Sequence, residues 1–166
     1  GNLPGYGWKG AENPNHRNDA YETFQESLDA HWAHFITGLQ EAHWAGGGLS
    51  THGYGDNPLD NGWWKEWTLL RYRFDQISIP FPCQIFLTEF GIDRGITGFP
   101  GGAEGRGWRT TGISAEEYAR QLKVVDDEML KDSLLVCAAI FSMGHGWPTY
   151  DVVGEPAIIE AVSRRV

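Results

Sequence analysis

The stretch QIFLTEFGIDRG, from Gln84 to Gly95, constrains the fold more than any other part of the sequence. Its apolar residues are typical of a buried strand, and the glycines that follow predict a loop. Glu89 interrupts the strand near its end, although glutamate is almost never fully buried unless it is paired. Because side chains alternate along a strand, Ile85, Leu87 and Glu89 share one face, so we expect Glu89 one layer above two core residues.

Two further apolar segments predict strands on either side of this one. LSTHGYG at residues 49–55 predicts an earlier strand, and LLVCAAIFSM at residues 134–143 predicts a later strand that is apolar on both faces. Segments with helical periodicity separate the strands, and they cover residues 21–44, 63–78, 115–131 and a short stretch from Pro156. Strands separated by helices predict an α/β fold in which helices cover a parallel sheet.

The length of the chain bears on which parallel architecture it adopts. A complete (β/α)8 barrel takes about 250 residues, whereas this chain has 166. Three or four βα units therefore fit the C-terminal half of a TIM-type barrel, and a self-contained doubly wound domain remains the alternative. A half-barrel leaves two open sheet edges, which makes a well-behaved monomer unexpected.

The composition argues against several classes of partner. The formal net charge of −9 and the lack of a Lys/Arg-rich run oppose binding to nucleic acid or to anionic lipid. No apolar run reaches the length of a membrane helix, and the first residues lack a signal-peptide pattern, so any targeting segment is expected to be removed or never present. We expect neither nucleic acid nor membrane as a partner.

Cysteine and histidine patterns do not predict a disulfide framework or a metal site. Cys83 and Cys137 form no CxxC pair, and we interpret both as buried apolar side chains in preference to a bridge. His31 and His34 are spaced to share a helix face, yet they belong to no established metal-ligand motif. No metal or other cofactor is expected.

Polar residues interrupt all three predicted strands at the same end. His52 and Tyr54, then Glu89, then Ser142 and His145 lie at or just after the carboxyl end of a strand, where parallel α/β folds place their active sites. A tyrosine and a histidine can hold a carboxylate ionised and oriented, and an aromatic ring can stack against a sugar. The alternative is a structural Glu89 that pairs with an arginine, either Arg94 or Arg71.

Three short motifs resemble those of one enzyme family. LTEFGID at residues 87–93 resembles the seventh strand of clan A glycoside hydrolases, the retaining β-glycosidases on a (β/α)8 barrel. STHGY at residues 50–54 is similar to the His-x-Tyr of their sixth strand, and AIFSMGHGW at residues 139–147 resembles the eighth strand. The motifs occur in the family's order with helix-length separations, and the resemblance covers about residues 20–166.

The resemblance implies roles for individual residues. Glu89 would be the nucleophile, Tyr54 the residue that hydrogen-bonds it, His52 its neighbour in the same motif, and Trp147 the stacking surface for substrate. The implied activity is hydrolysis of β-glycosidic bonds in a glycan or glycoside by retaining double displacement. A carbohydrate substrate is therefore the expected ligand, and degradation of polysaccharide favours a secreted or extracellular location over the cytoplasm.

One element of the family pattern is lacking in these 166 residues. Clan A enzymes carry a general acid/base Glu, usually after Asn, at the end of strand four, but the chain has no Asn-Glu pair, and Glu12 follows Ala11 in a loop. We expect residues 1–166 to be the C-terminal half-barrel, from about strand five or six to eight, with the acid/base Glu in an absent N-terminal half. That half or a second copy would cover the open sheet edges, and the isolated chain is predicted to be inactive or nearly so.

Aromatic and polar side chains in the loops after the strands are candidate substrate ligands, because sugar rings stack on indole and sugar hydroxyls bind carboxylates. The candidates are Trp63, Asp93, Trp108 and Trp147, with Asp56, Asn57 and Arg94 as rim residues on position alone. The loop at residues 91–112 is expected to be mobile over the catalytic face, presenting Phe99, Arg106 and Trp108. The alternative function is a non-catalytic carbohydrate-binding or structural barrel. The sequence does not specify the sugar, the linkage, or endo versus exo action.

Overall fold

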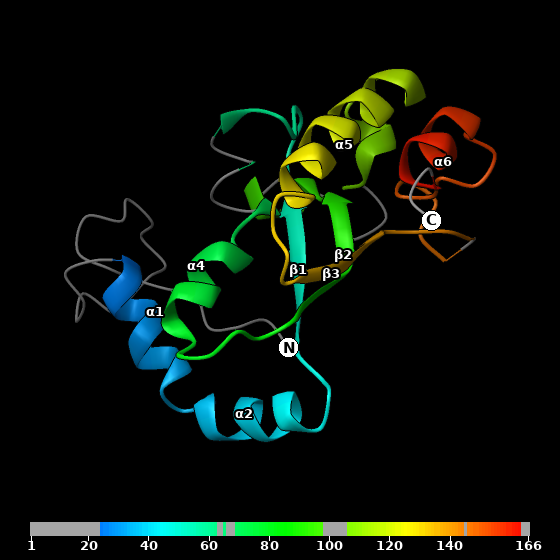
Figure 1. Cartoon of the computed structure of the whole chain (residues 1–166). Helices are drawn as coiled ribbons and strands as arrows, with labels where there is room; N and C mark the ends of the chain where they lie inside the picture. The colour runs from blue at the N-terminus through cyan, green and yellow to red at the C-terminus, as the bar shows by residue number, and fades with distance from the viewer. Residues whose placement is uncertain (1–23, 63–64, 66–68, 98–105, 145, 164–166) are drawn as a thin grey trace. The chain divides into compact units, whose positions relative to one another are not determined.

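The computed structural model describes residues 24–62, 65, 69–97, 106–144 and 146–163 (Figure 1). The chain divides into two compact units, of which one comprises Gly1–Gly48 with Arg73–Cys83 and the other comprises Leu49–Tyr72 with Gln84–Val166. Each unit is therefore described by itself.

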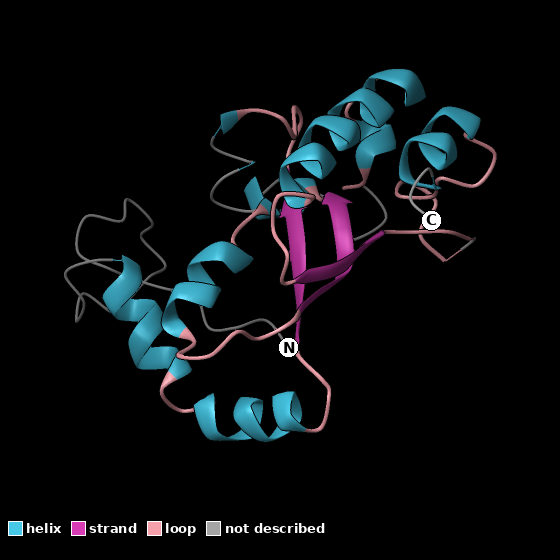
Figure 2. Cartoon of the chain, viewed as in Figure 1, coloured by secondary structure: helices cyan, strands magenta, loops and turns pink. Residues whose placement is uncertain are grey.

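The second unit is built on a three-stranded parallel sheet in the order β1-β2-β3 (Figure 2). The strands are β1 (Leu49–Gly55), β2 (Ile85–Ile92) and β3 (Leu135–Ile140). The prediction of an α/β chain with parallel strands is confirmed, while three strands suit a half-barrel and a doubly wound sheet alike.

The register of β1 on β2 brings His52 opposite Glu89. A register shift between Thr51 and His52 gives β1 one residue fewer than β2 at this point, which is the geometry of a β-bulge. Because Thr51 pairs with Leu87 and His52 pairs with Glu89, the prediction that Glu89 shares the face of Ile85 and Leu87 is wrong: the bulge interrupts the alternation of β2. Gly53 lies where a Cβ atom would come within 3.0 Å of the Leu69 carbonyl oxygen. The close approach of the 69–70 backbone to β1 therefore requires a residue without a side chain at this position.

Helix α5 (Ala115–Met129) shows how local signals and packing agree in this unit. The Ser114 hydroxyl accepts a hydrogen bond from the Glu117 backbone N–H at 3.2 Å, as the predicted N-terminal cap requires. The predicted apolar face is confirmed, since its four members are all buried: Tyr118, Leu122, Val125 and Met129. This face joins Ile85 and Leu87 of β2 in one hydrophobic core. The unit also contains the short helices η2 (Arg94–Thr97), η4 (Trp108–Thr110) and α6 (Pro156–Ser163).

The first unit contains helices α1 (Phe24–Trp32) and α2 (Ile36–Trp44), and α4 (Tyr72–Ser78) begins at the boundary between the units. The prediction of one continuous helix over residues 21–44 is wrong, because the helix is interrupted between Trp32 and Ile36. The Trp32 indole N–H donates to the buried Asp75 carboxylate at 3.0 Å, which fixes the end of α1 against α4. Of the helix predicted over residues 63–78, the first residues lie largely outside the described part of the chain.

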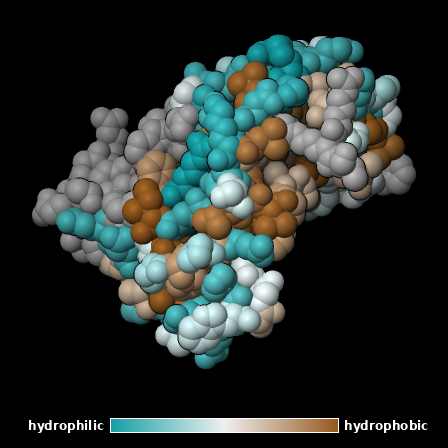
Figure 3. Space-filling view, viewed as in Figure 1, coloured by the Kyte–Doolittle hydropathy of each residue, from teal (hydrophilic) through white to brown (hydrophobic). Residues whose placement is uncertain are grey.

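Strand β3 is far more exposed than its sequence predicts. Four of its six residues are exposed, and Val136 retains 51% of its accessible surface. The physical reason is its position, because β3 pairs only with β2 in the described sheet. The prediction that both cysteines are buried is therefore right for Cys83 and wrong for Cys137, and both are free thiols. Hydrophobic side chains also reach the surface on the face shown in Figure 3.

Candidate active site

The Glu89 carboxylate is held by two side chains of the neighbouring strand. The Tyr54 hydroxyl donates to Glu89 Oε2 at 2.7 Å, and His52 Nδ1 lies 3.1 Å from the same oxygen. The Glu89 side chain is 36% exposed, so an external molecule has access to the carboxylate. Among the described residues, no side chain binds Oε1.

The arrangement follows from the strand geometry. His52 and Tyr54 are two residues apart on β1, so their side chains share a face, and the register puts that face beside Glu89 of β2. Their rings are in edge-to-face contact with centroids 6.1 Å apart, which limits the orientations available to both. The contacts expected of Glu89 at the end of its strand are thus present.

The alternative partner for Glu89 was an arginine. Arg94 lies instead with Nε 3.7 Å from Asp56 Oδ1, and its Nη1 donates to the Thr110 carbonyl oxygen at 3.2 Å. Arg94 therefore connects the loops after β1 and β2, while Glu89 accepts a hydrogen bond from Tyr54 and lies 3.1 Å from His52 Nδ1.

The environment keeps Tyr54 protonated. Burial, followed by the hydrogen bond to Glu89 and the charge of that carboxylate, raises the pKa of Tyr54 far above its ordinary value. A phenol in this state remains a hydrogen-bond donor throughout the pH range in which most enzymes work. Tyr54 can therefore donate its hydrogen bond to the Glu89 carboxylate throughout that range.

An aromatic cluster lies next to this pair. The Phe141 ring is in edge contact with Tyr54, Trp147 and Tyr150 at centroid distances of 6.1, 5.7 and 5.2 Å. Trp147 is 40% exposed, so part of its indole is available to a ligand, and its ring also contacts Tyr150 at 6.0 Å. The structure thus connects Trp147 to Glu89 through Phe141 and Tyr54.

Phe141 and Tyr150 were not among the site residues predicted from the sequence. Phe141 directly follows the last residue of β3, so the rule that sites gather at the carboxyl ends of parallel strands was sufficient to find it. Tyr150 carries no such signal, because it is reached only through the turn in which its backbone N–H donates to the Trp147 carbonyl oxygen at 3.0 Å.

Asp93 lies at the edge of the same site. Its backbone N–H donates to the Gly55 carbonyl oxygen at 3.0 Å, and its Oδ1 accepts from the Gly95 N–H at 2.7 Å. Burial and the hydrogen-bonded Asp93 carboxylate raise the pKa of Tyr150 above its ordinary value, and the charge of Asp93 also contributes to the raised pKa of Tyr54. The structure therefore places Asp93 within the electrostatic reach of Tyr54 and Tyr150.

Trp108 belongs to the core and does not face a ligand. It is 3% exposed, its ring stacks on Tyr118 at 5.2 Å, and its indole N–H donates to the Tyr150 carbonyl oxygen at 3.1 Å. The prediction of a sugar-binding Trp108 is not supported by this placement, because both the ring and its polar group already have partners inside the protein. Trp63, His145 and Phe99 lie outside the described residues.

Other candidates are accounted for by structure. Asn57 accepts a hydrogen bond from the Gln121 side chain at 2.9 Å, which ties the loop after β1 to α5. Within the described ranges no group of His, Cys, Asp and Glu side chains has a geometry that could hold a metal ion. No helix in those ranges is long and apolar enough to cross a membrane.

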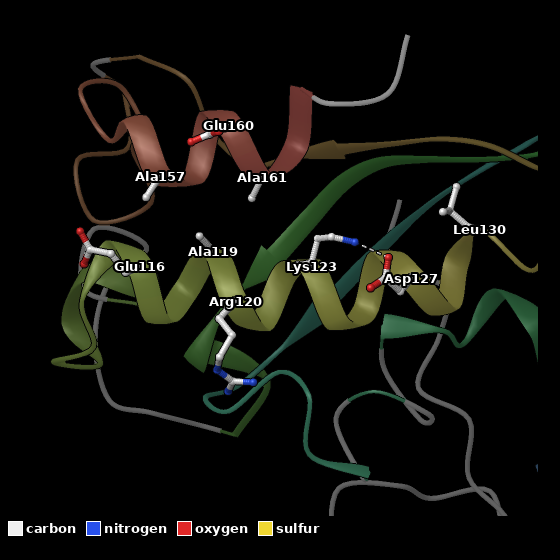
Figure 4. Close-up of a pocket in the computed structure, with 9 residues that line it drawn as sticks. All are labelled: Glu116, Ala119, Arg120, Lys123, Asp127, Leu130, Ala157, Glu160 and Ala161. Carbon is white, nitrogen blue, oxygen red and sulfur yellow. Dashed lines mark hydrogen bonds and ion pairs between the residues drawn. The ribbon is translucent and has the colours of Figure 1, made fainter.

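A hollow of about 570 Å³ lies elsewhere in the same unit, along α5 and α6 (Figure 4). Ala119, Ala157 and Ala161 line it together with charged side chains, among them Lys123 and Asp127, which pair with each other along α5. It contains none of the predicted site residues, so we locate the candidate site at the carboxyl ends of β1 and β2 instead.

Comparison with known proteins does not assign a family or a function to this site. No family model, no curated protein and no solved structure matches the chain.

Proposed function

We propose that this chain carries the nucleophile of a retaining β-glycoside hydrolase whose catalytic domain is a (β/α)8 barrel. The observation that supports this most is the carboxylate of Glu89 with one oxygen bound by Tyr54 at 2.7 Å and by His52 at 3.1 Å. The other oxygen has no described partner, and Tyr54 and Glu89 lie in the carboxyl-terminal halves of parallel strands, with His52 at the middle of β1.

In the proposed reaction, Glu89 Oε1 attacks the anomeric carbon of a β-glycoside while the bond to the leaving oxygen breaks. A second carboxylic acid, about 5 to 5.5 Å away in enzymes of this class, gives its proton to that oxygen. The same group, now a carboxylate, then takes a proton from water as the water displaces Glu89 from the sugar. The anomeric configuration is thereby retained.

The surrounding residues have separate parts in this proposal. Tyr54 and His52 orient the carboxylate before attack and bind Oε2 after the negative charge has been consumed in the ester. Trp147 offers an indole face to a sugar ring, with Phe141 and Tyr150 fixing its position. Asp93 is placed to accept hydrogen bonds from sugar hydroxyls, as carboxylates in sugar sites do.

The proposed reaction also requires a second carboxylic acid. We expect it in an N-terminal half-barrel, and the exposure of β3 supports a further strand beyond this edge of the sheet. Such a strand would come from that half or from a second copy of the chain. We therefore propose that this chain alone turns over ordinary glycosides slowly or not at all.

A test of Glu89 that does not depend on the second acid uses a dinitrophenyl 2-deoxy-2-fluoro-β-glycoside. Dinitrophenolate leaves without protonation, and the fluorine slows hydrolysis of the glycosyl-enzyme. We expect release of dinitrophenolate in proportion to protein and a mass increase of one fluoroglycosyl group on the peptide that contains Glu89. Several glycosyl groups are tested, since the sugar is not specified.

Three variants make this test specific. Glu89→Gln should abolish labelling, whereas Glu117→Gln, which changes an exposed carboxylate of α5, should leave it unchanged. Tyr54→Phe should slow labelling roughly 10- to 100-fold, because a hydrogen bond to a charged group contributes about 1.5–3 kcal/mol. Label on another residue, or unchanged labelling of Glu89→Gln, would refute the proposal.

The alternative function is carbohydrate binding without catalysis. The exposed Trp147 could stack on a sugar in a binding protein as well as in an enzyme. Such a protein should bind oligosaccharides but remain unlabelled by every fluoroglycoside. Trp147→Ala should then abolish binding, whereas Glu89→Gln should have little effect on it.

A further inference from the structure

The loops after the three strands carry charged side chains of both signs around Glu89. Both signs occur there, and the described members are Asp56, Asp60, Lys65, Arg71, Asp93, Arg94, Arg106, Arg109, Asp151 and Glu155. Asp60 pairs with Arg120 at 2.8 Å, and Lys65 and Arg71 each interact with other groups of the chain. Whether these charges are directed at a ligand or at one another decides which sugars the site suits.

Arg94 and Arg109 are both held by groups of the protein itself. Arg94 lies 3.7 Å from Asp56 and donates to the Thr110 carbonyl oxygen. Arg109 lies 2.7 Å from Glu155 through Nη2, and its Nε donates to the Asp151 carbonyl oxygen at 3.0 Å. Both guanidinium groups connect one loop to another.

Arg106 and Asp93 lie on the same side of Gly95. A Cβ atom at Gly95 would collide with both Arg106 Nη1 and Asp93 Oδ1, so the two groups are neighbours. Besides burial, the two charges also act in opposite directions on the pKa of Tyr150, which Asp93 raises and Arg106 lowers. The third arginine thus has a carboxylate nearby.

The remaining carboxylates also have partners within the chain. Asp151 Oδ1 accepts from the backbone N–H groups of Gly144 at 3.0 Å and Val153 at 2.9 Å. Glu89 is bound by Tyr54 and His52. Each of these charged groups is therefore stabilised by the protein before any ligand arrives.

We infer that the substrate of this site is a neutral glycan, one without carboxylate, sulfate or free amino groups. The inference rests on the proposed function and narrows its substrate class. A charged sugar would have to displace one of the internal pairs, and an anionic sugar would also approach the Glu89 carboxylate and a chain of net charge −9. A neutral sugar needs only the Trp147 face and hydrogen bonds to its hydroxyls.

The test measures binding to the complete 166-residue chain with glycans that differ only in charge. Neutral β-linked gluco-, xylo-, manno- and N-acetylchito-oligosaccharides are screened by calorimetry or tryptophan fluorescence. A gluco- or manno-oligosaccharide that binds is compared with the same backbone oxidised to the uronic acid at C6. A xylo-oligosaccharide is compared with its form bearing glucuronic acid branches, and an N-acetylchito-oligosaccharide with its deacetylated form.

We expect each charged member to bind at least roughly tenfold more weakly than its neutral counterpart, a difference of about 1.4 kcal/mol. Binding of the neutral member should be the same at about 0.05 and 0.5 M salt, since screening acts on charge interactions. Equal or tighter binding of a charged member would overturn the inference and leave the proposed function standing. Failure of every glycan to bind would overturn both.

A variant makes the role of internal pairing explicit. Asp56→Asn removes the charge beside Arg94 but keeps an acceptor for the Asn57 N–H, which Asp56 binds at 2.7 Å. We expect this variant to gain affinity for the carboxylated glycan by several-fold. Asp127→Asn, which removes a similar charge next to Lys123 on α5, is the control and should change nothing. If the Asp56→Asn variant prefers neutral over carboxylated glycans as strongly as the natural chain does, internal pairing of charges is not the cause of that preference.

Discussion

Strands β2 and β3 have similar apolar sequences but very different surroundings. In β2, Ile85 and Leu87 are almost completely buried, whereas in β3 Val136 is half exposed and Cys137 is exposed. The difference lies in their neighbours, since β2 is paired on both sides and β3 on one side only within the described sheet. An apolar sequence thus permits a strand to be buried, and the strands paired on its two sides determine whether it is buried.

The largest effect on this comparison is expected from truncation in β2. Leu87→Ala should lower the free energy of unfolding by about 2–5 kcal/mol, because the side chain is 1% exposed and its loss leaves a cavity in the core. Denaturant unfolding followed by circular dichroism measures this value. A loss below about 1 kcal/mol would show that β2 is not the central buried strand.

The next effect is expected at Gly91, near the end of β2. Its φ of +141° is unfavourable for other residues, and a Cβ atom would lie 2.5 Å from the Tyr118 hydroxyl. Gly91→Ala should therefore destabilise the protein by about 1–3 kcal/mol in the same unfolding experiment. Gly146→Ala, in the loop after β3, is the matched control, because no atom of the described residues lies within 4 Å of its Cβ position.

A smaller, pH-dependent effect is expected from tyrosine burial beside β2. Burial raises the pKa of Tyr118 in the folded state, so the unfolded chain loses this proton first as the pH rises. The stability from Tyr118 is therefore complete below about pH 10 and falls above it by up to about 1.4 kcal/mol per pH unit. Urea unfolding between about pH 8 and 11 should show a shallower decline in Tyr118→Phe. Identical declines in both proteins would contradict this.

The smallest effect is expected in β3. Val136→Ala should change the free energy of unfolding of the isolated chain by no more than about 0.5 kcal/mol, the usual range for surface positions. A cost comparable to that of Leu87→Ala would show that β3 is covered in solution. Size-exclusion chromatography of both variants would then reveal whether the cover is a second copy.

The features that the sequence predicted depend on local rules. His52 and Tyr54 share a face because strand side chains alternate with a period of two, whereas Glu89 joins that face only through the register shift between β1 and β2. The cap of α5 at Ser114 depends on residues three positions apart. Such features can be predicted because they depend on residues that are close in the sequence.

The features that the sequence did not predict depend on distant contacts. Trp108 was expected to face a ligand, but Tyr118 and the Tyr150 carbonyl oxygen supply partners that its loop position does not reveal. The break in the helix predicted over residues 21–44 coincides with the contact between Trp32 and Asp75 of α4. The exposure of β3 likewise reflects which strands are adjacent, and hydropathy carries no information on adjacency.

The bulge between Thr51 and His52 has a consequence for how the chain tolerates insertions and deletions. Both groups that hold Glu89 come from β1, so the carboxylate is oriented only while β1 and β2 keep their alignment. Residues added between the two strands lengthen a connection and leave that alignment intact. One residue added to or removed from β1 before His52 would turn His52 and Tyr54 to the opposite face, so the site would be lost while the fold persists.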